Sequence, residues 1–270
     1  MTVRRLYSLA RNYLKWKMSR FPLPSELASI HDDAIAYAST IQNIVAAQGG
    51  CQSLSSEALN VLAFSAILYH RSVRTLCEEG WTPTAPVLNR TLLDIFANCV
   101  AVTYDGSNAE YMGFKYMSHF HRKWLTDPQI TAPELAEVNA ALDMMSGRLN
   151  PSEQVKAQAL RAVQNPPAFW FRPEYNSIEA IMKLCTTPMY ELYRFYSGPA
   201  HGGFSGKFVF DDDPHLEDIE PRQHARNTPR AILASTRLLI EICRIRDTWD
   251  NGGAGEAVYK ELVQRISNLK

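Results

Sequence analysis

The chain has 270 residues, 46% of them hydrophobic, which is enough to bury the core of one large domain or two small ones. Its 28 lysines and arginines balance 28 aspartates and glutamates, so the composition excludes a globally basic surface for nucleic acid and leaves only a local one. The five cysteines lack Cys-x-x-Cys spacing, which excludes a zinc knuckle and a disulfide framework and indicates buried thiols in the cytoplasm.

The first element is a basic N-terminal helix with its linker, residues 1–24. Its first twenty residues contain six lysines and arginines and no acidic residue, and Phe21-Pro22-Leu23-Pro24 then interrupts the helix. No apolar run with a cleavage site follows the first arginines, so a secretory signal is not expected. Three alternatives stay open for this helix: it stacks Tyr7, Tyr13 and Trp16 on RNA, it contacts an anionic membrane, or it docks on its own chain or a second subunit.

Three long helices are predicted in the first part of the remaining chain. Apolar residues recur at spacings of three and four from Leu27 to Ile44, and this helix stops at Gly49-Gly50. A second helix spans about Ser55 to Glu79, with a serine as its cap and a glycine after its end. A third spans about Thr84 to Tyr104 and starts with a proline in its first turn.

The middle of the chain continues the helical pattern. A helix is expected from about Asn108 to Leu125, and Thr131 with Glu134 forms a capping-box pattern for a shorter one. Prolines then bracket an aromatic loop that contains Trp170, and helices resume near Ser177.

Two Thr-Pro pairs predict helix starts in the last third of the chain. Thr187-Pro188 begins one helix, and Thr228-Pro229 begins another that ends near Trp249. Residues 198–221 between them are expected to form a long irregular loop. The whole pattern predicts an all-α, multi-helix bundle of antiparallel helices, in which residues 25–270 form a single helical domain.

Arg90 and Asp94 are unusual because they occur inside an apolar helix. They are four residues apart on one helix face, so they would pair with each other. A charge in an apolar stretch needs a partner, and these charges also disfavour a membrane span over residues 87–104. Two roles stay open: an ion pair that fixes the helix register, and support for a catalytic histidine or a ligand phosphate.

Arg194 and His201 form the most compact chemical pair in the chain. An arginine stays positive and matches phosphate in a bidentate way, while a histidine titrates near neutrality and passes protons. The pair would therefore grip and cleave a phosphodiester. The structural alternative is that Arg194 pairs with an acid such as Asp94 or Glu191 while His201 caps a helix end.

Tyr193 and Ser197 lie beside this pair and share one helical face. Their hydroxyls would contact a ligand bound there. The alternative is that Tyr193 packs in the core and Ser197 bonds to the backbone of its own helix.

Two local patterns carry a family resemblance. The first runs from Arg74 to Gly80 and on to an Arg-x-x-x-acid signature at Arg90 and Asp94. The second is Tyr193-x-x-x-Ser197-x-x-x-His201. With the helical spacing over about residues 55–205, the chain resembles the bacterial domain of unknown function 5677 family, and more remotely the HEPN superfamily of helical ribonucleases and nucleotide-binding modules.

The HEPN resemblance implies an activity. Ribonucleases of that superfamily use an Arg-x(4–6)-His-type motif and build a composite site across a dimer, and Arg194 and His201 match its arginine and histidine. The resemblance implies a homodimeric, metal-independent RNA endonuclease of a bacterial defence or toxin system, without a cofactor and with an antitoxin or regulatory protein as a further partner. His201 would act as general acid or base and Arg194 would stabilise the phosphate charge, with Arg90 and Asp94 as supports.

Two departures from that motif keep an alternative function open. Phe195 stands where a polar residue usually follows the arginine, and Gly198-Pro199 falls inside the spacer. Both favour a non-catalytic helical module that binds a nucleotide, an RNA or a protein partner through the same pocket.

A metal site is not expected. His119 and His121 are two residues apart on a helix and point about 200° away from each other, so they do not easily share one ion. The chain also lacks a Gly-x-x-x-x-Gly-Lys-Ser/Thr loop and a Gly-x-Ser-x-Gly elbow, so NTPase and α/β-hydrolase functions have no support.

Overall fold

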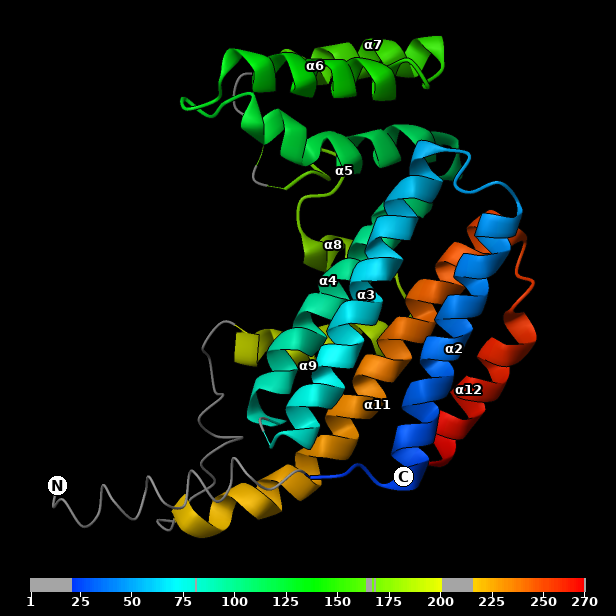
Figure 1. Cartoon of the computed structure of the whole chain (residues 1–270), viewed down its shortest axis with the longest axis vertical. Helices are drawn as coiled ribbons and strands as arrows, with labels where there is room; N and C mark the ends of the chain where they lie inside the picture. Colours follow the sequence, from blue (N-terminus) through cyan, green and yellow to red (C-terminus); the bar gives the residue numbers. More distant parts are fainter. Residues whose placement is uncertain (1–20, 81, 164–166, 168, 201–215, 270) are drawn as a thin grey trace, which may run out of the picture.

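The apolar stripes of the predicted helices pack against one another in a helical bundle, which a computed structural model of the chain shows in Figure 1. The structure describes residues 21–80, 82–163, 167, 169–200 and 216–269, and these residues contain no β-strand. The prediction of an all-α bundle is therefore confirmed. The α-helices are α2 (Ser25–Ala47), α3 (Leu54–Glu78), α4 (Ala85–Thr103), α5 (Ala109–Trp124), α6 (Ala132–Ser146), α7 (Pro151–Arg161), α8 (Ile178–Met182), α9 (Thr187–Ala200), α11 (Leu216–Asn251) and α12 (Glu256–Asn268).

Four long helices, α2, α3, α4 and α11, form the centre of the bundle (Figure 1). α11 contacts the other three, and α12 packs along α2 and α11. On the opposite side, α8 and α9 pack on α4. This arrangement makes α9 an outer helix that rests on a core helix.

A second, smaller core lies at one end of the bundle. α5 crosses the first turn of α3 and carries the hairpin of α6 and α7 on its outer side (Figure 1). The apolar residues between these helices form a cluster of their own, which consists of Leu54, Tyr111, Phe114, Val138, Leu142, Met145, Leu149 and Ala157. The end of the bundle is thus stabilised separately from its centre.

Several predicted helix ends are confirmed, and each has a local cause. α2 stops before Gly49 and Gly50, whose φ angles of 94° and 84° are left-handed values that favour glycine. At the start of α3, Ser53 Oγ accepts a hydrogen bond of 3.1 Å from Ser56 N. At the start of α6, Thr131 and Glu134 form the expected capping box.

The prediction for residues 198–221 and for the helix after Thr228-Pro229 is wrong in its boundaries. α9 extends to Ala200 and α11 already begins at Leu216, so only residues 201–215 separate them, and these lie outside the described residues. α11 passes through Pro221 and Pro229 and bends in its first part (Figure 1). A proline inside a helix costs about 3 kcal/mol. Burial of the turns after Pro229, which include fully buried Ile232, offsets that cost.

Two helices were not predicted, although their sequences carry helix signals. Asn150 caps α7 by accepting a hydrogen bond of 3.0 Å from Glu153 N, and Glu153 completes a capping box. α12 buries Tyr259 and Leu262, three residues apart, against the bundle.

The apolar helix α4 lies inside the bundle. Among the described helices it is the one that is long and apolar enough to cross a membrane, and 61% of its apolar window is buried within the protein. Its neighbours include α3, α5, α9 and α11, and most of its apolar residues are buried against them. The predicted N-terminal helix falls on residues 1–20, which lie outside the described part of the chain.

Candidate functional site

Arg90 joins α4 to α9. It is only 9% exposed, and it forms an ion pair with Asp94 one turn later on the same helix. Its guanidinium also lies over the ring of Tyr193, 4.6 Å from the ring centroid. A nearly buried cation needs such partners, and a carboxylate with an aromatic face supplies them. The three predicted residues Arg90, Asp94 and Tyr193 therefore lie together and fix α9 on α4.

The other polar groups of α9 bond mainly to the protein itself. Tyr190 stacks with Tyr193 at a centroid distance of 6.4 Å, and its hydroxyl donates a hydrogen bond of 3.0 Å to Glu179. Ser197 Oγ donates a hydrogen bond of 2.7 Å to the Tyr193 carbonyl, within the same helix. The Ser197 hydroxyl thus makes a backbone bond.

Arg194, in contrast, is a surface residue. Its side chain is 64% exposed, and its ion-pair partner is Glu191 at 3.7 Å, which is itself 60% exposed. An exposed pair of this kind contributes little to stability. Phe195, the next residue, is 48% exposed. Arg194 is therefore held loosely, whereas Asp94, the other acid proposed as its partner, is paired with Arg90.

The histidine of the predicted pair, His201, lies outside the described residues, so the Arg194–His201 site stays a prediction. The residues before it differ from the expectation, because Gly198 and Pro199 do not break the helix. Both lie in the last turn of α9, which ends at Ala200. A proline in the last turn of a helix removes only one hydrogen bond, which explains why it is tolerated there.

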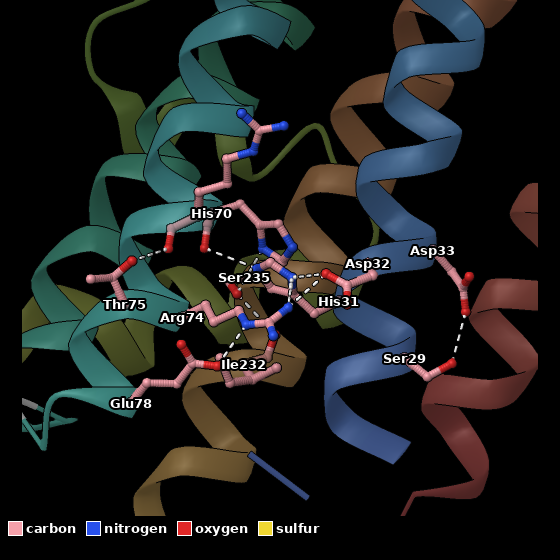
Figure 2. A network of polar contacts seen from close by, with 11 residues as sticks. Ser29, His31, Asp32, Asp33, His70, Arg74, Thr75, Glu78, Ile232 and Ser235 are labelled. Carbon is pink, nitrogen blue, oxygen red and sulfur yellow. Dashed lines mark hydrogen bonds and ion pairs between the residues drawn. The ribbon is translucent and has the colours of Figure 1, made fainter. Parts of the chain in front are cut away.

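A second polar centre, shown in Figure 2, lies between α2, α3 and α11. His31 and His70 are buried and stack with a centroid distance of 3.9 Å. The Ser235 hydroxyl donates to the Ile232 carbonyl at 2.9 Å and lies 3.0 Å from His70 Nδ1. Ser235 Oγ is therefore the acceptor for His70, which places a proton on Nδ1 of that ring.

Arg74 covers the outer side of this histidine pair. It forms ion pairs with Asp32 at 2.6 Å and with Glu78 at 2.8 Å, and its NH1 lies 3.4 Å from His31 Nδ1 (Figure 2). His31 Nε2 lies 3.4 Å from the His70 carbonyl and donates to it. His31 Nδ1 also lies 3.3 Å from Asp32 Oδ1, so a carboxylate and the Arg74 guanidinium both face this nitrogen. Burial lowers the pKa of His31 and the nearby Arg74 lowers it further, whereas Asp32 and the His70 carbonyl act in the opposite direction.

Sequence reasoning missed this centre. His31 and His70 occupy positions on the buried stripes of α2 and α3, where a histidine does not differ in spacing from the leucines and alanines around it. The available signal was a titratable residue on an apolar stripe, because such a residue requires a buried partner. The partner, Ser235, is 165 residues away from His70 in the chain.

A model of a family of unknown function, DUF5677, matches residues 57–215, which is more than half of the 270 residues. The chain belongs to the DUF5677 family. Comparison of this DUF5677 protein with curated proteins and with solved structures gives no match.

The segment that matches the family model contains one polar centre of the DUF5677 protein completely and the other only in part. It contains α4 and α9 entirely, and so it includes the Arg90–Tyr193 contact, Arg194 and His201. It includes His70 but neither His31 nor Ser235, which lie on α2 and α11. The residues of the predicted nuclease site thus all belong to the family segment, while the histidine pair is completed from outside it.

In the part of the DUF5677 protein that the structure describes, no group of three or more His, Cys, Asp or Glu residues is arranged to hold a metal ion. The two histidines with i, i+2 spacing differ in environment. His119 is buried, whereas His121 is half-buried, with its Nδ1 3.3 Å from the Met117 carbonyl.

The buried histidines make the stability of the DUF5677 protein depend on pH. Burial lowers the pKa of His70 well below its usual 6.5, and burial also lowers the pKa of His31. The unfolded chain therefore binds more protons than the folded protein once the pH falls below about 6.5. The contribution of these histidines to the free energy of unfolding is fully present above that pH and decreases as the pH falls below it. When the pH is lowered from about 7.5 to about 5.5, we expect the free energy of unfolding measured in urea to decrease by about 1 kcal/mol more for the wild type than for His70→Gln.

His121→Gln is the control for this comparison, because it removes a histidine that lies outside the stacked pair. It should keep the pH dependence of the wild type. If His70→Gln shows the same pH dependence as the wild type, His70 is not held neutral in the folded protein.

Proposed function

We propose that this DUF5677 protein is a metal-independent RNA endonuclease whose site is centred on Arg194 and His201. The observation that carries the proposal is the state of Arg194. This guanidinium is 64% exposed, and its ion pair among the described residues is with an exposed acid at 3.7 Å, so its donors remain accessible to a ligand. A fork of donors with a permanent charge is suited to a phosphodiester.

The contacts of Arg90 indicate that Arg194, and not Arg90, would bind the phosphate of RNA. Arg90 is nearly buried, paired with Asp94 and covered by the Tyr193 ring, so its charge is already compensated. It acts as a positioning residue, because it anchors Tyr193 and with it the neighbouring Arg194 on α9. Of the two arginines that sequence patterns single out, Arg194 is the one that remains for a ligand.

The chemistry proposed for the pair requires no metal. His201 takes the proton of an RNA 2′-hydroxyl, and the resulting oxygen attacks the adjacent phosphorus. The bond from phosphorus to the 5′-oxygen breaks, that oxygen takes a proton from water, and His201 releases its own proton to the solvent. Arg194 stabilises the negative charge that grows on the phosphate oxygens. The products are a 2′,3′-cyclic phosphate and a 5′-hydroxyl.

The assembly and role that we propose follow from the HEPN resemblance. A homodimer would bring two Arg194–His201 pairs together, and a bacterial defence or toxin system would require an antitoxin or regulatory protein as a partner. The proposed location is the cytoplasm. The basic residues 1–24 would add RNA or membrane contact.

The direct test is to incubate the full-length protein with end-labelled RNA in excess EDTA and to analyse the product ends. We expect cleavage that EDTA does not suppress and fragments with cyclic phosphate ends. Cleavage that disappears in EDTA, or fragments that carry 3′-hydroxyl ends, would refute the metal-independent mechanism.

A second candidate function is a non-catalytic module that binds RNA through the same face of α9. Phe195 favours it, because an exposed aromatic ring beside an arginine is suited to stacking on a base. Intact RNA that nevertheless shifts in a gel would support this module. Intact RNA without a shift would contradict both candidates.

A further inference from the structure

One face of α5 carries an unusual set of buried polar groups. Lys115, Ser118, His119 and Arg122 follow one another at helical spacings of three, one and three residues, so they share a face. Lys115 and Ser118 are completely buried, and His119 and Arg122 are 7% and 3% exposed. Two permanent cations and a histidine are thus removed from water on a single helix face.

The charge of Lys115 is compensated within the protein. Its ammonium donates a hydrogen bond of 2.7 Å to the Arg172 carbonyl and forms an ion pair with Glu174. It also lies 5.8 Å from the centroid of the Tyr111 ring. A buried ammonium with these partners is a satisfied structural group.

The charge of Arg122 is not compensated in this way. Both terminal nitrogens of its guanidinium are shielded from solvent and have no hydrogen-bond acceptor, and none of the ion pairs between described residues includes Arg122. Several other arginines also have a shielded nitrogen without an acceptor, but for them it is Nε alone. These arginines, each paired with an acid, are Arg90, Arg237, Arg244 and Arg246.

An uncompensated guanidinium in a buried position is costly. Desolvation of an unpaired charge costs several kcal/mol, and proteins compensate it with an opposite charge or with hydrogen bonds. His119 is a second unsatisfied group on this face, because its buried Nδ1 also has no hydrogen-bond partner. Burial lowers the pKa of His119 to about 4, and the positive charges of Lys123 and Arg122 act in the same direction. The site therefore lacks a negative charge.

We propose that this face of α5 binds a phosphate-class oxyanion on Arg122 and His119. Two parallel N–H donors of a guanidinium match two oxygens of a phosphate, and the buried position makes this charge-assisted bond strong. Lys115, already paired with Glu174, would not contact the anion. The terminal phosphate of a nucleotide presents the same group as free phosphate.

This site is independent of the proposed nuclease site. α5 packs on α3, α4, α6 and α7, whereas Arg194 lies on α9, which packs on α4 and α8. Phosphate binding by Arg122 would persist in a variant without Arg194. Failure of either proposal thus leaves the other unaffected.

The test is titration of the full-length protein with inorganic phosphate by isothermal calorimetry, at an ionic strength held constant with sodium chloride. We expect saturable binding and a melting temperature that rises with phosphate concentration. Arg122→Met keeps the apolar stem but removes the donors, and it should weaken phosphate binding by about tenfold or more. The general stabilising effect of phosphate salts acts on the whole surface and would be retained in this variant.

Two further variants make the result decisive. Arg148→Met removes an arginine that pairs with Glu57 at 2.7 Å on the same end of the bundle, and it should bind phosphate like the wild type. Arg122→Lys keeps the charge but loses the fork, so weaker binding by this variant supports the proposal even if Arg122→Met does not fold. If AMP competes with inorganic phosphate, the ligand is the phosphate of a nucleotide. If AMP does not compete, the ligand is the free phosphate ion. Equal phosphate binding by wild type, Arg122→Met and Arg122→Lys, or no saturable binding, would overturn the proposal.

Discussion

Replacing Gly113 with alanine is expected to destabilise the protein by about 3 kcal/mol, because α5 and α3 touch backbone to backbone at this glycine. A Cβ atom at position 113 would lie 2.5 Å from Ser55 N and 2.7 Å from the Leu54 carbonyl oxygen. Backbone atoms in a helix do not give way as a flexible side chain does. The two helices would have to move apart.

This movement would also break a cap. Glu110, one turn before Gly113, accepts hydrogen bonds from Leu54 N at 2.9 Å and Ser55 N at 3.4 Å and so satisfies the first turn of α3. Separation of the helices would lengthen both bonds. In thermal unfolding the effect corresponds to a decrease in melting temperature of about 6–12 °C for a protein of this size.

Gly106→Ala is the matched control, since a Cβ atom there would meet nothing within 4 Å. Its melting temperature should stay close to that of the wild type. An unchanged melting temperature for Gly113→Ala would show that the contact between α5 and α3 is looser than the structure indicates.

Arg194→Ala and His201→Ala are expected to lower the rate of RNA cleavage by about 10²–10³-fold each, because each would remove one of the two groups that perform the proposed reaction. Arg194 is exposed and loosely paired, so its removal should leave the helical circular-dichroism signal and the melting temperature almost unchanged. A loss of activity without a loss of stability is the result that separates catalysis from a structural role.

Lys260→Ala is the control for the charge change. Lys260 also lies on an outer helix and pairs with an acid of its own helix at 3.6 Å, and its side chain is 72% exposed. It lies on α12, which packs on α2 and α11 and not on α4 (Figure 1). The control should cleave RNA at the wild-type rate. Wild-type cleavage by Arg194→Ala or by His201→Ala would remove that residue from the mechanism.

The positions of Arg90 and Tyr193 connect the fold to this proposal. Arg90 is a cation inside the apolar helix α4, and its charge is balanced by Asp94 on the same helix and by a ring from α9. The contact with Tyr193 orients the helix that presents Arg194. The core therefore supports the surface residue that we propose to act on RNA.

Local features were readable from the sequence because their causes are local. The ends of α2, α3 and α6 follow from glycines, a serine cap and a capping box within a few residues of each end. The Arg90–Asp94 pair was predictable for the same reason, since a separation of four residues places both side chains on one helix face. The start of α11 was not predictable from its Thr-Pro pair, because the helix continues through Pro229 instead of beginning there.

The sequence by itself determined the helical class, the apolar stripes that form the core and the i, i+4 ion pair of α4, because these depend on periodicity and short-range geometry. Only the tertiary structure decided which charges are compensated. It placed Tyr193 over Arg90, brought Ser235 to His70, and buried Arg122 without an acceptor. These outcomes depend on how distant helices pack, and helix spacing along the chain contains no information about which side chain faces which across the core.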